Sequence, residues 1–229
     1  MTRTTVPPEA IDYFNRHHPL QALKARAALR ARRAMYARVL ELARPEAGTR
    51  ILDVGTTPDL DLPYNNFFER WYPDPQSVTV CSIEDCSSFE QVFPGVTFRR
   101  ITSDSLPFAN REFDLALSFA VLEHVGDEAQ QRHFVREMAR VADRFILYTP
   151  YRYFPVEMHT FIPLSHWLPA RWYRAAWARM GLAFWADERN LNLLSRRDIR
   201  GLLPQSGRSA VRLRWAFGCP AHLEISWTR

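Results

Sequence analysis

The most informative stretch of this chain is Ile51-Leu-Asp-Val-Gly-Thr-Thr-Pro-Asp59. Its apolar beginning is typical of a buried strand, and the glycine that follows lets the backbone approach a ligand that a Cβ atom would exclude. A loop that cradles a phosphate would continue with further glycines, whereas this loop continues with Thr-Thr-Pro-Asp. The stretch therefore predicts a ligand-binding turn at the end of a strand, with an altered loop chemistry.

Short apolar runs alternate with helical patterns on the carboxyl side of this strand, and such runs are typical of parallel strands covered on both faces. We expect the first strand at 50–54, further strands at 77–83, 96–101, 113–119 and 144–149, and helices at 66–71, 86–93, 128–142, 169–180 and 195–203. Two last strands, 212–217 and 223–227, would form a hairpin linked by Gly218-Cys219-Pro220. The pattern predicts an α/β, doubly wound sheet of seven strands with a C-terminal antiparallel hairpin and helices on both faces.

The region before the first strand is predicted to be helical. An apolar stripe at helical spacing indicates a long helix at 20–43, and a shorter helix is expected at 9–18. We therefore divide the chain into an N-terminal helical extension, residues 1–49, and a single α/β domain, residues 50–229. Within that domain the aromatic and proline-rich residues 150–194 are predicted to form a lid insertion, here called the acceptor-side segment.

The charge and cysteine content narrow the classes of function. The net charge is +5, but Lys24 is the only lysine, and the densest basic cluster lies on the predicted long helix. A solvated helix face is the favoured interpretation, with a membrane surface or an anionic partner as the alternative. Three cysteines make no disulfide framework, and the sequence shows no signal peptide or membrane-spanning run, so we expect a cytoplasmic protein.

Four segments at predicted strand ends resemble those of the class I S-adenosylmethionine-dependent methyltransferases. They are Ile51-Leu-Asp-Val-Gly55, Glu84, Leu106-Pro-Phe108 with Phe113-Asp114, and Phe119-Ala-Val-Leu-Glu-His-Val125. The resemblance implies a Rossmann-like fold, S-adenosylmethionine as cofactor, and methyl transfer to a small-molecule or glycan-like acceptor such as an envelope precursor. The alternative is a non-catalytic binding or scaffold protein that has kept the sheet, which the missing glycines suggest.

The resemblance also implies which residues bind the cofactor. Glu84, at the end of the second strand, would accept hydrogen bonds from the ribose hydroxyls, with Asp85 as the substitute if the strand register differs by one. Asp53 would lie near the methionine ammonium, beside Gly55. Either Thr56 or Thr57 would offer a hydroxyl to the methionine carboxylate.

Three more positions are predicted to surround the adenosyl group. The family places an acid four residues before the leucine of Leu-Pro-Phe, but that position is Thr102 here, and Asp104 is the nearest substitute. Phe119 would lie beside the cofactor, and His124 would line either the adenine pocket or the acceptor entrance. Asp59, in the altered loop, would have to point away, because a second carboxylate would repel that of the cofactor.

Glu157 and His159 are the candidate catalytic residues. In an extended segment two residues apart they point the same way, so the carboxylate could orient the histidine as a general base for an oxygen or nitrogen acceptor. A hydrogen-bonded pair that only holds the loop in place is the alternative. His166 follows nearby, but this spacing is not a zinc pattern, so no metal is predicted.

Other cofactor and substrate classes are disfavoured. Gly-x-Gly-x-x-Gly is absent, which argues against a nicotinamide enzyme. No Asn-Pro-Pro-Tyr-like motif follows the fourth strand, so a nucleic acid partner is not expected. The acceptor atom and the oligomeric state stay open.

Overall fold

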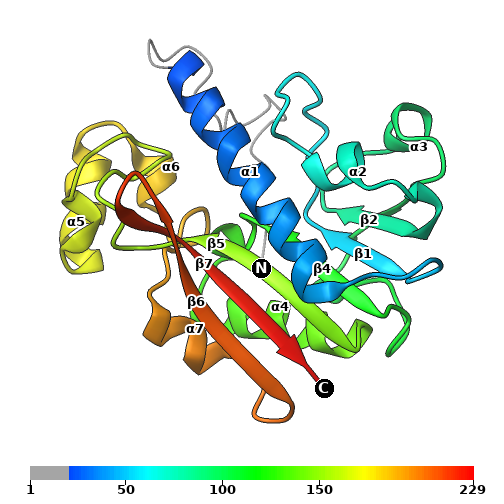
Figure 1. The fold of residues 1–229 in the computed structure, drawn as a ribbon. Coiled ribbons are helices and arrows are strands. Elements are labelled where there is room, and N and C mark those ends of the chain that lie inside the picture. Colours follow the sequence, from blue (N-terminus) through cyan, green and yellow to red (C-terminus); the bar gives the residue numbers. More distant parts are fainter. Residues whose placement is uncertain (1–20) are drawn as a thin grey trace.

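A single seven-stranded sheet organises the molecule. The computed structural model describes the backbone of residues 21–229 and the side chains from Ala25 onward. The strand order is β3-β2-β1-β4-β5-β7-β6, with β1 to β5 parallel and β7 antiparallel to both of its neighbours (Figure 1). This confirms the predicted doubly wound sheet with a C-terminal antiparallel hairpin. The strands are β1 (Ile51–Val54), β2 (Val78–Ser82), β3 (Thr97–Arg100), β4 (Leu115–Phe119), β5 (Arg144–Pro150), β6 (Arg208–Ala216) and β7 (Cys219–Thr228).

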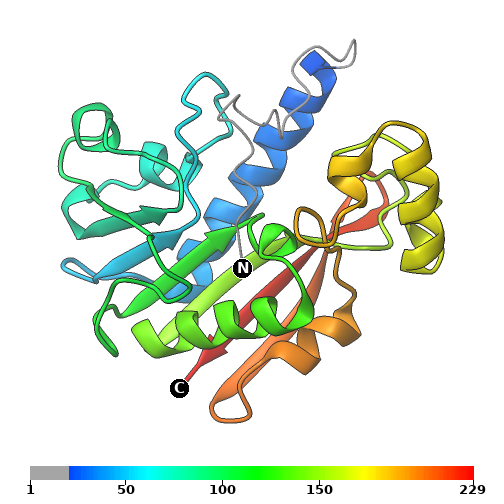
Figure 2. The ribbon, with the colours of Figure 1, turned by 180° about the vertical axis from the view of Figure 1, so that it is seen from behind.

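Helices cover both faces of the sheet, as predicted. Figure 1 shows α1, α2 and α3 on one face, and the reverse view in Figure 2 shows α4 and α7 on the other. The helix predicted at 9–18 lies outside the described residues. The helices are α1 (Gln21–Ala43), α2 (Phe67–Trp71), α3 (Phe89–Val92), α4 (Glu128–Val141), α5 (Ala170–Arg179), α6 (Ala183–Ala186) and α7 (Arg196–Leu202), with 3-10 turns η1 (Pro75–Ser77), η2 (Leu122–His124) and η3 (Ser165–Trp167).

Capping boxes explain where two of these helices begin. The Asp127 carboxylate accepts a hydrogen bond from the Gln130 N–H, and the Gln130 side-chain oxygen accepts one from the Asp127 N–H. Helix α4 begins at Glu128, directly after Asp127. Ser195 and Asp198 make the same reciprocal pair ahead of α7, which confirms the predicted helix start. Each box provides partners for backbone N–H groups that a helix N-terminus otherwise leaves unpaired.

The C-terminal hairpin differs from the sequence prediction in the position of its turn. The turn is Phe217-Gly218, and both residues have positive φ, 52° and 76°. A two-residue turn of this kind matches the right-handed twist of the strands, so both strands extend further than predicted and Cys219 and Pro220 belong to β7. Pro220 pairs with Trp215 at a register shift, where a missing N–H is tolerated.

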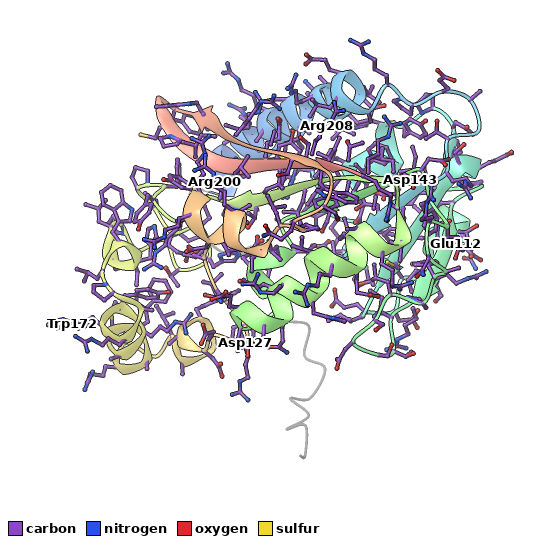
Figure 3. All side chains as sticks on the ribbon, turned by 90° about the horizontal axis from the view of Figure 1, so that it is seen from below. Glu112, Asp127, Asp143, Trp172, Arg200 and Arg208 are labelled. Carbon is purple, nitrogen blue, oxygen red and sulfur yellow. The ribbon has the colours of Figure 1, made fainter. Side chains whose placement is uncertain are left out.

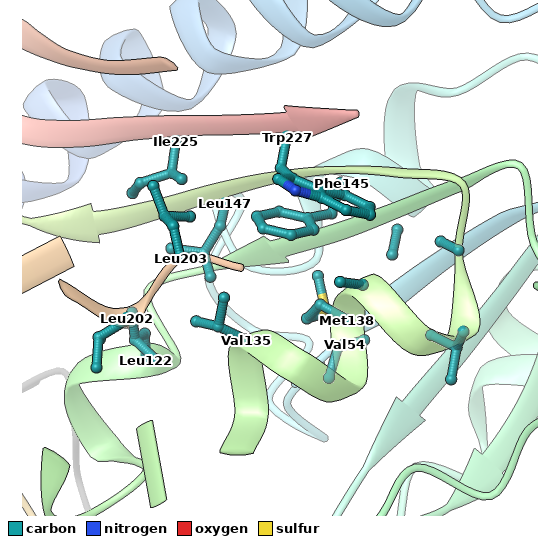
Figure 4. Packing of buried hydrophobic residues seen from close by; sticks show 14 of the residues in the cluster. Val54, Leu122, Val135, Met138, Phe145, Leu147, Leu202, Leu203, Ile225 and Trp227 are labelled. Carbon is teal, nitrogen blue, oxygen red and sulfur yellow. The ribbon is translucent and has the colours of Figure 1, made fainter. Parts of the chain in front are cut away.

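Two hydrophobic clusters, one on each face of the sheet, form the core. Figure 4 shows the cluster beneath α4 and α7, where Met138 and Val135 of α4 face the side chains of the sheet. Phe145 and Trp227 stack there with ring centroids 5.5 Å apart and planes 15° apart. Each buried side chain of this size stabilises the fold by about 1.5–3 kcal/mol, so the central strands are held firmly and their ends are defined.

Helix α1 is packed into the cluster on the opposite face. Met35 and Val39 are buried there, and the Tyr36 hydroxyl donates to the Trp71 carbonyl oxygen at 2.8 Å. The Arg38 guanidinium also reaches the buried carboxylate of Glu224 on β7, at 3.5 Å. These contacts fix how α1 crosses the sheet. Among the described residues, no helix combines the length and the apolar character needed to cross a membrane.

Candidate functional site

A cavity of about 1090 Å³ opens at the carboxyl ends of the parallel strands. It lies beside β1 and β4, where the strand order reverses, which is the usual ligand position in open α/β sheets. Its walls come from α1, the loops after β1, β2 and β4, and the acceptor-side segment. Of the predicted site residues, the cavity is lined by Asp53, Gly55, Thr56, Thr57, Glu84, Asp104, Phe119, His124, Glu157 and His159.

Gly55 is required by both conformation and space. Its φ is +95°, and a Cβ atom would lie 2.3 Å from a methyl carbon of Val121. Its N–H donates to the Cys81 carbonyl oxygen at 2.8 Å, which carries the β1–β2 pairing into the loop. The backbone at the end of β1 therefore stays close to the loop after β4, and any residue larger than glycine would force them apart.

The altered loop is held by Asn66, which the sequence prediction did not identify. Its amide nitrogen donates to the Thr57 carbonyl oxygen at 2.8 Å, and its amide oxygen accepts from the Thr57 N–H at 3.2 Å. Asn66 itself has a left-handed backbone, φ 49°, which asparagine adopts more readily than most residues. Asp59 does not line the cavity, and its carboxylate accepts from the Asp61 N–H at 3.0 Å.

Buried carboxyl groups lie at and next to the cavity wall. Asp53, Glu69 and Glu123 are all almost fully buried, and Asp53 and Glu123 line the cavity. Burial raises the pKa of Asp53 to about 6, although the charge of Arg32 acts in the opposite direction. Burial and the neighbouring Asp53 raise the pKa of Glu69, and neither carboxyl oxygen of Glu69 has a hydrogen-bond partner among the described residues.

Glu123 adds an unsatisfied acceptor to this wall. One of its oxygens accepts from the Thr149 hydroxyl at 2.9 Å. The other oxygen, Oε1, is buried and has no hydrogen-bond partner among the described residues. Burial raises the pKa of Glu123, since nothing close by fully compensates the loss of water. An acceptor of this kind suits a cationic ligand, and S-adenosylmethionine carries both an ammonium and a sulfonium.

Arg32 brings a positive charge from α1 into the same cavity. Its guanidinium lies 5.4 Å from the centre of the Phe67 ring. Burial lowers the pKa of Arg32, while the charges of Glu123 and Asp53 act against that shift. The N-terminal helix therefore contributes to the site, and the sequence prediction missed this residue because a single arginine in an arginine-rich helix carries no local signal.

The acidic residues that follow β2 and β3 occupy different positions relative to the cavity. Glu84 follows β2 and lines the cavity, and burial raises its pKa. Asp85 does not line it; the Asp85 carboxylate accepts from the Ser87 N–H at 3.0 Å and shapes the turn. Asp104 lines the cavity at the far end, where its carbonyl oxygen contacts the His133 ring nitrogen at 3.0 Å. Phe119 packs edge-on against Phe67, with ring centroids 4.6 Å apart.

Glu157 and His159 form a close pair on the acceptor side of the cavity. The Nδ1 atom of His159 lies 2.6 Å from Oε1 of Glu157. Burial alone would raise the pKa of Glu157, but hydrogen bonds from His159 and Thr160 outweigh it and lower that pKa to about 2. Because the carboxylate stays ionised, it keeps the proton of His159 on Nδ1 and leaves Nε2 as the basic atom.

His124 packs against this pair on the same side of the cavity. Its ring meets the His159 ring edge-on with centroids 5.0 Å apart, and its Nδ1 atom lies 2.7 Å from the Asn190 carbonyl oxygen. Burial lowers the pKa of His124 to about 3, so the ring is neutral. Trp185 covers His159 with a ring-centroid distance of 4.8 Å. No group of three histidine, cysteine or carboxylate residues in the described part of the chain could hold a metal ion.

Comparison with known protein families gives a match over part of the chain. A family model described as a methyltransferase domain matches residues 70–144, from α2 to β5. The match begins after the altered loop, the part of the site that departs most from the family pattern. A search of curated proteins finds no match.

Several solved structures share the fold. An S-adenosylmethionine-dependent methyltransferase from Mesorhizobium loti is 18% identical over 84% of this chain and 96% of its own, with a TM-score of 0.54. Magnesium protoporphyrin IX methyltransferase from Synechocystis, solved with SAH bound, is 16% identical over 93% of this chain and 88% of its own, with a TM-score of 0.56. The N-terminal domain of EvdMO1 with SAH bound is 17% identical over 92% and 84%, with a TM-score of 0.52.

The family model matches about a third of the chain, and the solved structures share its fold. The chain thus contains a segment that matches a methyltransferase domain, within a fold that S-adenosylmethionine-dependent methyltransferases share.

Proposed function

We propose that the protein is an S-adenosylmethionine-dependent methyltransferase that methylates a hydroxyl or amine of a small-molecule or glycan-like acceptor, with His159 removing the acceptor proton. The observation that carries the proposal is the Glu157–His159 contact of 2.6 Å on the wall of the cavity that also contains the predicted cofactor residues. The Glu157 carboxylate also accepts from the backbone N–H groups of His159 and Thr160, so the pair holds its loop as well as lining the cavity.

The residues at the other end of the cavity fit the cofactor by charge. Glu84, which lines the cavity, would accept from the ribose hydroxyls, and Asp53 with Glu123 would bind the methionine ammonium. Arg32 would bind the methionine carboxylate, because a guanidinium can bind a carboxylate with two parallel hydrogen bonds. The bound cofactor supplies a methyl group activated by its sulfonium.

The protein's own part in the reaction is orientation and proton removal. The acceptor lone pair forms the new bond to the methyl carbon while the carbon–sulfur bond breaks, and the acceptor proton moves to Nε2 of His159. Glu157 stabilises the imidazolium that results, because it is ionised and hydrogen-bonded to the opposite nitrogen. Trp185 and His124 shield this side of the cavity from water.

A volume near 1090 Å³ lies at the upper end of the range for small-molecule sites, about 300–1,000 Å³, so the cavity has room for an acceptor beside the cofactor. Aromatic side chains of the acceptor-side segment line part of it, including Tyr151 and Phe154. A ring-shaped acceptor such as a sugar or an aromatic compound would fit against these surfaces.

The test is product analysis by mass spectrometry over a panel of glycan-like and small aromatic acceptors. With the acceptor that reacts, His159→Gln is expected to lower kcat by about 10²- to 10⁴-fold, the range for loss of a general base. Glu157→Gln should lower kcat less, because Nε2 stays in place. Cofactor affinity, measured by calorimetry, should be unchanged in both variants. Full kcat in His159→Gln would contradict the assignment of the base.

A further inference from the structure

The acceptor-side segment has an unusual charge pattern. From Met158 to Ala186 the chain contains no aspartate or glutamate, although arginines recur at positions 171, 174 and 179. Arg174 turns inward and pairs with Glu188 at 3.3 Å. Arg171 and Arg179 have no ion pair with any described residue. The outer side of α5 is therefore cationic without compensation.

Large apolar side chains are exposed on the same side. Trp172 is 60% exposed, Leu168 51%, Trp167 45% and Tyr153 41%. Figure 3 shows Trp172 projecting outward from α5, at the edge of the molecule. Aromatic side chains with one wet edge, mixed with leucine, are what proteins place at a boundary between water and lipid.

These side chains form two adjacent contact groups, one of Arg152, Tyr153, Trp167 and Leu168, and one of Arg171 and Trp172 at the start of α5. The rings of Tyr153 and Trp167 lie 6.2 Å apart, and the Arg152 guanidinium lies 5.9 Å from the Tyr153 ring centre. Arg152 also donates to the Leu168 carbonyl oxygen at 3.2 Å. The backbone N–H of Trp172 donates to the Pro169 carbonyl oxygen at 2.8 Å, so the first turn of α5 directly follows Leu168. We call the set Arg152, Tyr153, Trp167, Leu168, Arg171 and Trp172 the aromatic–arginine face.

The opposite side of the segment has its own small core, so the exposed side chains are not needed to stabilise it. Tyr173 and Trp177 of α5 are buried against Leu191 and Leu193. Exposed apolar area that the fold does not use is typical of an interaction surface. Because Arg171 and Arg179 have no ion pair with any described residue, this side of α5 favours a partner of negative charge.

We propose that the aromatic–arginine face binds the surface of an anionic lipid bilayer. Tryptophan, tyrosine and leucine would enter the headgroup region, and Arg171 with Arg152 would pair with lipid phosphates. The same segment supplies Met158 and His159 to the cavity wall. The catalytic cavity would then lie next to the membrane surface, where an acceptor carried on a lipid can reach it.

Vesicle flotation with the full chain tests the proposal. The wild-type protein should float with vesicles of phosphatidylcholine mixed with phosphatidylglycerol, much less with phosphatidylcholine alone, and less as salt rises. Leu168→Ala combined with Trp172→Ala should weaken the partition coefficient about tenfold. Arg171→Glu should weaken it about fivefold or more, from the contribution of one basic residue near an anionic surface. All these side chains are exposed, and circular dichroism checks that the variants fold.

Matched controls lie on other parts of the surface. Val92→Ala, on α3, changes an exposed apolar residue, and Arg208→Glu, on β6, reverses an exposed arginine far from Trp172 in Figure 3. Both controls should float like the wild type.

Three outcomes would overturn the proposal. One is a wild-type protein that stays with neither vesicle type. Another is equal flotation of the wild type and the Leu168→Ala, Trp172→Ala variant. The third is the absence of vesicle binding together with either dimer formation, seen by sedimentation, or binding to a single-stranded RNA, where these substitutions abolish the dimer or the RNA binding. The face would then bind a second copy of the chain or a nucleic acid.

Discussion

Arg32 was not a predicted site residue, but it lines the cavity. Thr56 and Thr57 were the predicted partners of the methionine carboxylate, and both line the cavity. The Thr56 hydroxyl is directed toward the Cys86 sulfur at 3.9 Å, and the Thr57 hydroxyl accepts from the Asp59 N–H at 3.3 Å. A guanidinium provides two charge-assisted donors, which makes Arg32 the stronger candidate for the carboxylate.

Replacing Arg32 should weaken cofactor binding through this one contact. Arg32→Gln is expected to raise the Kd for S-adenosylmethionine about tenfold or more, the value of a hydrogen bond to a charged group. The Kd for decarboxylated S-adenosylmethionine, which lacks the carboxylate, should change little. Isothermal titration calorimetry measures both ligands.

The matched control is Arg30→Gln, an exposed arginine on the same helix that does not line the cavity. Its Kd for either ligand should equal that of the wild type. Equal losses for both ligands in Arg32→Gln would show that Arg32 does not contact the carboxylate.

The loop after β1 is held in place without the usual glycines. In this chain the side-chain amide of Asn66, at the start of α2, takes over the backbone groups of Thr57. Tyr64 and Asn65, which lie between this loop and α2, line the same cavity as Gly55. We therefore propose that the segment 58–66 borders the methionine end of the cofactor, with Asp59 outside the cavity wall.

Asn66 is expected to be important for the stability of this loop. Asn66→Gly keeps the left-handed backbone but loses both hydrogen bonds, and it should lower the free energy of unfolding by about 1–3 kcal/mol. Asn66→Ala should cost about 1–2 kcal/mol more, because alanine also strains the left-handed conformation. Urea denaturation measures both, and an Asn66→Ala variant as stable as Asn66→Gly would contradict the backbone argument.

At the scale of the whole molecule, neutral buried histidines make folding sensitive to acid. Burial lowers the pKa of His124 to about 3 and that of His222 to about 4. Both residues line the cavity, one after β4 and the other on β7. In the unfolded chain the same rings titrate at the ordinary value of 6.5, so acid favours the unfolded state.

The sign of this effect gives a pH prediction. The folded state binds no proton at His124 between about pH 6.5 and about 3, whereas the unfolded state does, so stability present above pH 6.5 is lost as the pH falls through this window. The free energy of unfolding of the wild type, relative to His124→Asn, should fall by up to about 1.4 kcal/mol per pH unit. Urea denaturation at a series of pH values measures the difference.

His222→Asn provides an independent repeat of the same measurement, with its window ending near pH 4. The double variant should show the sum of the two slopes, since the sites lie on different elements. A constant difference between wild type and His124→Asn across the whole pH range would contradict the prediction.

Local features of the sequence determined the architecture. Apolar runs that alternate with helical patterns predict a doubly wound sheet with helices on both faces. Such a prediction is possible because the burial of a strand and the periodicity of a helix both depend on residues that are close together in the sequence. Gly55, Glu84, and the Glu157–His159 pair were predictable for the same reason: each stands at a strand end or within a short motif.

Only the tertiary structure decided which side chains meet in the cavity. Arg32 and Glu123 come from α1 and η2, and the apolar packing of α1 against the sheet brings Arg32 to the cavity at the end of β1. Glu84 rather than Asp85 lines the cavity because of how the chain bends after β2 ends at Ser82, where the Asp85 carboxylate instead accepts from the Ser87 N–H. The hairpin turn at Phe217-Gly218 depended on strand twist. Long-range packing and register leave no mark on a short stretch of sequence, and this is why the chemistry of the site needed the fold.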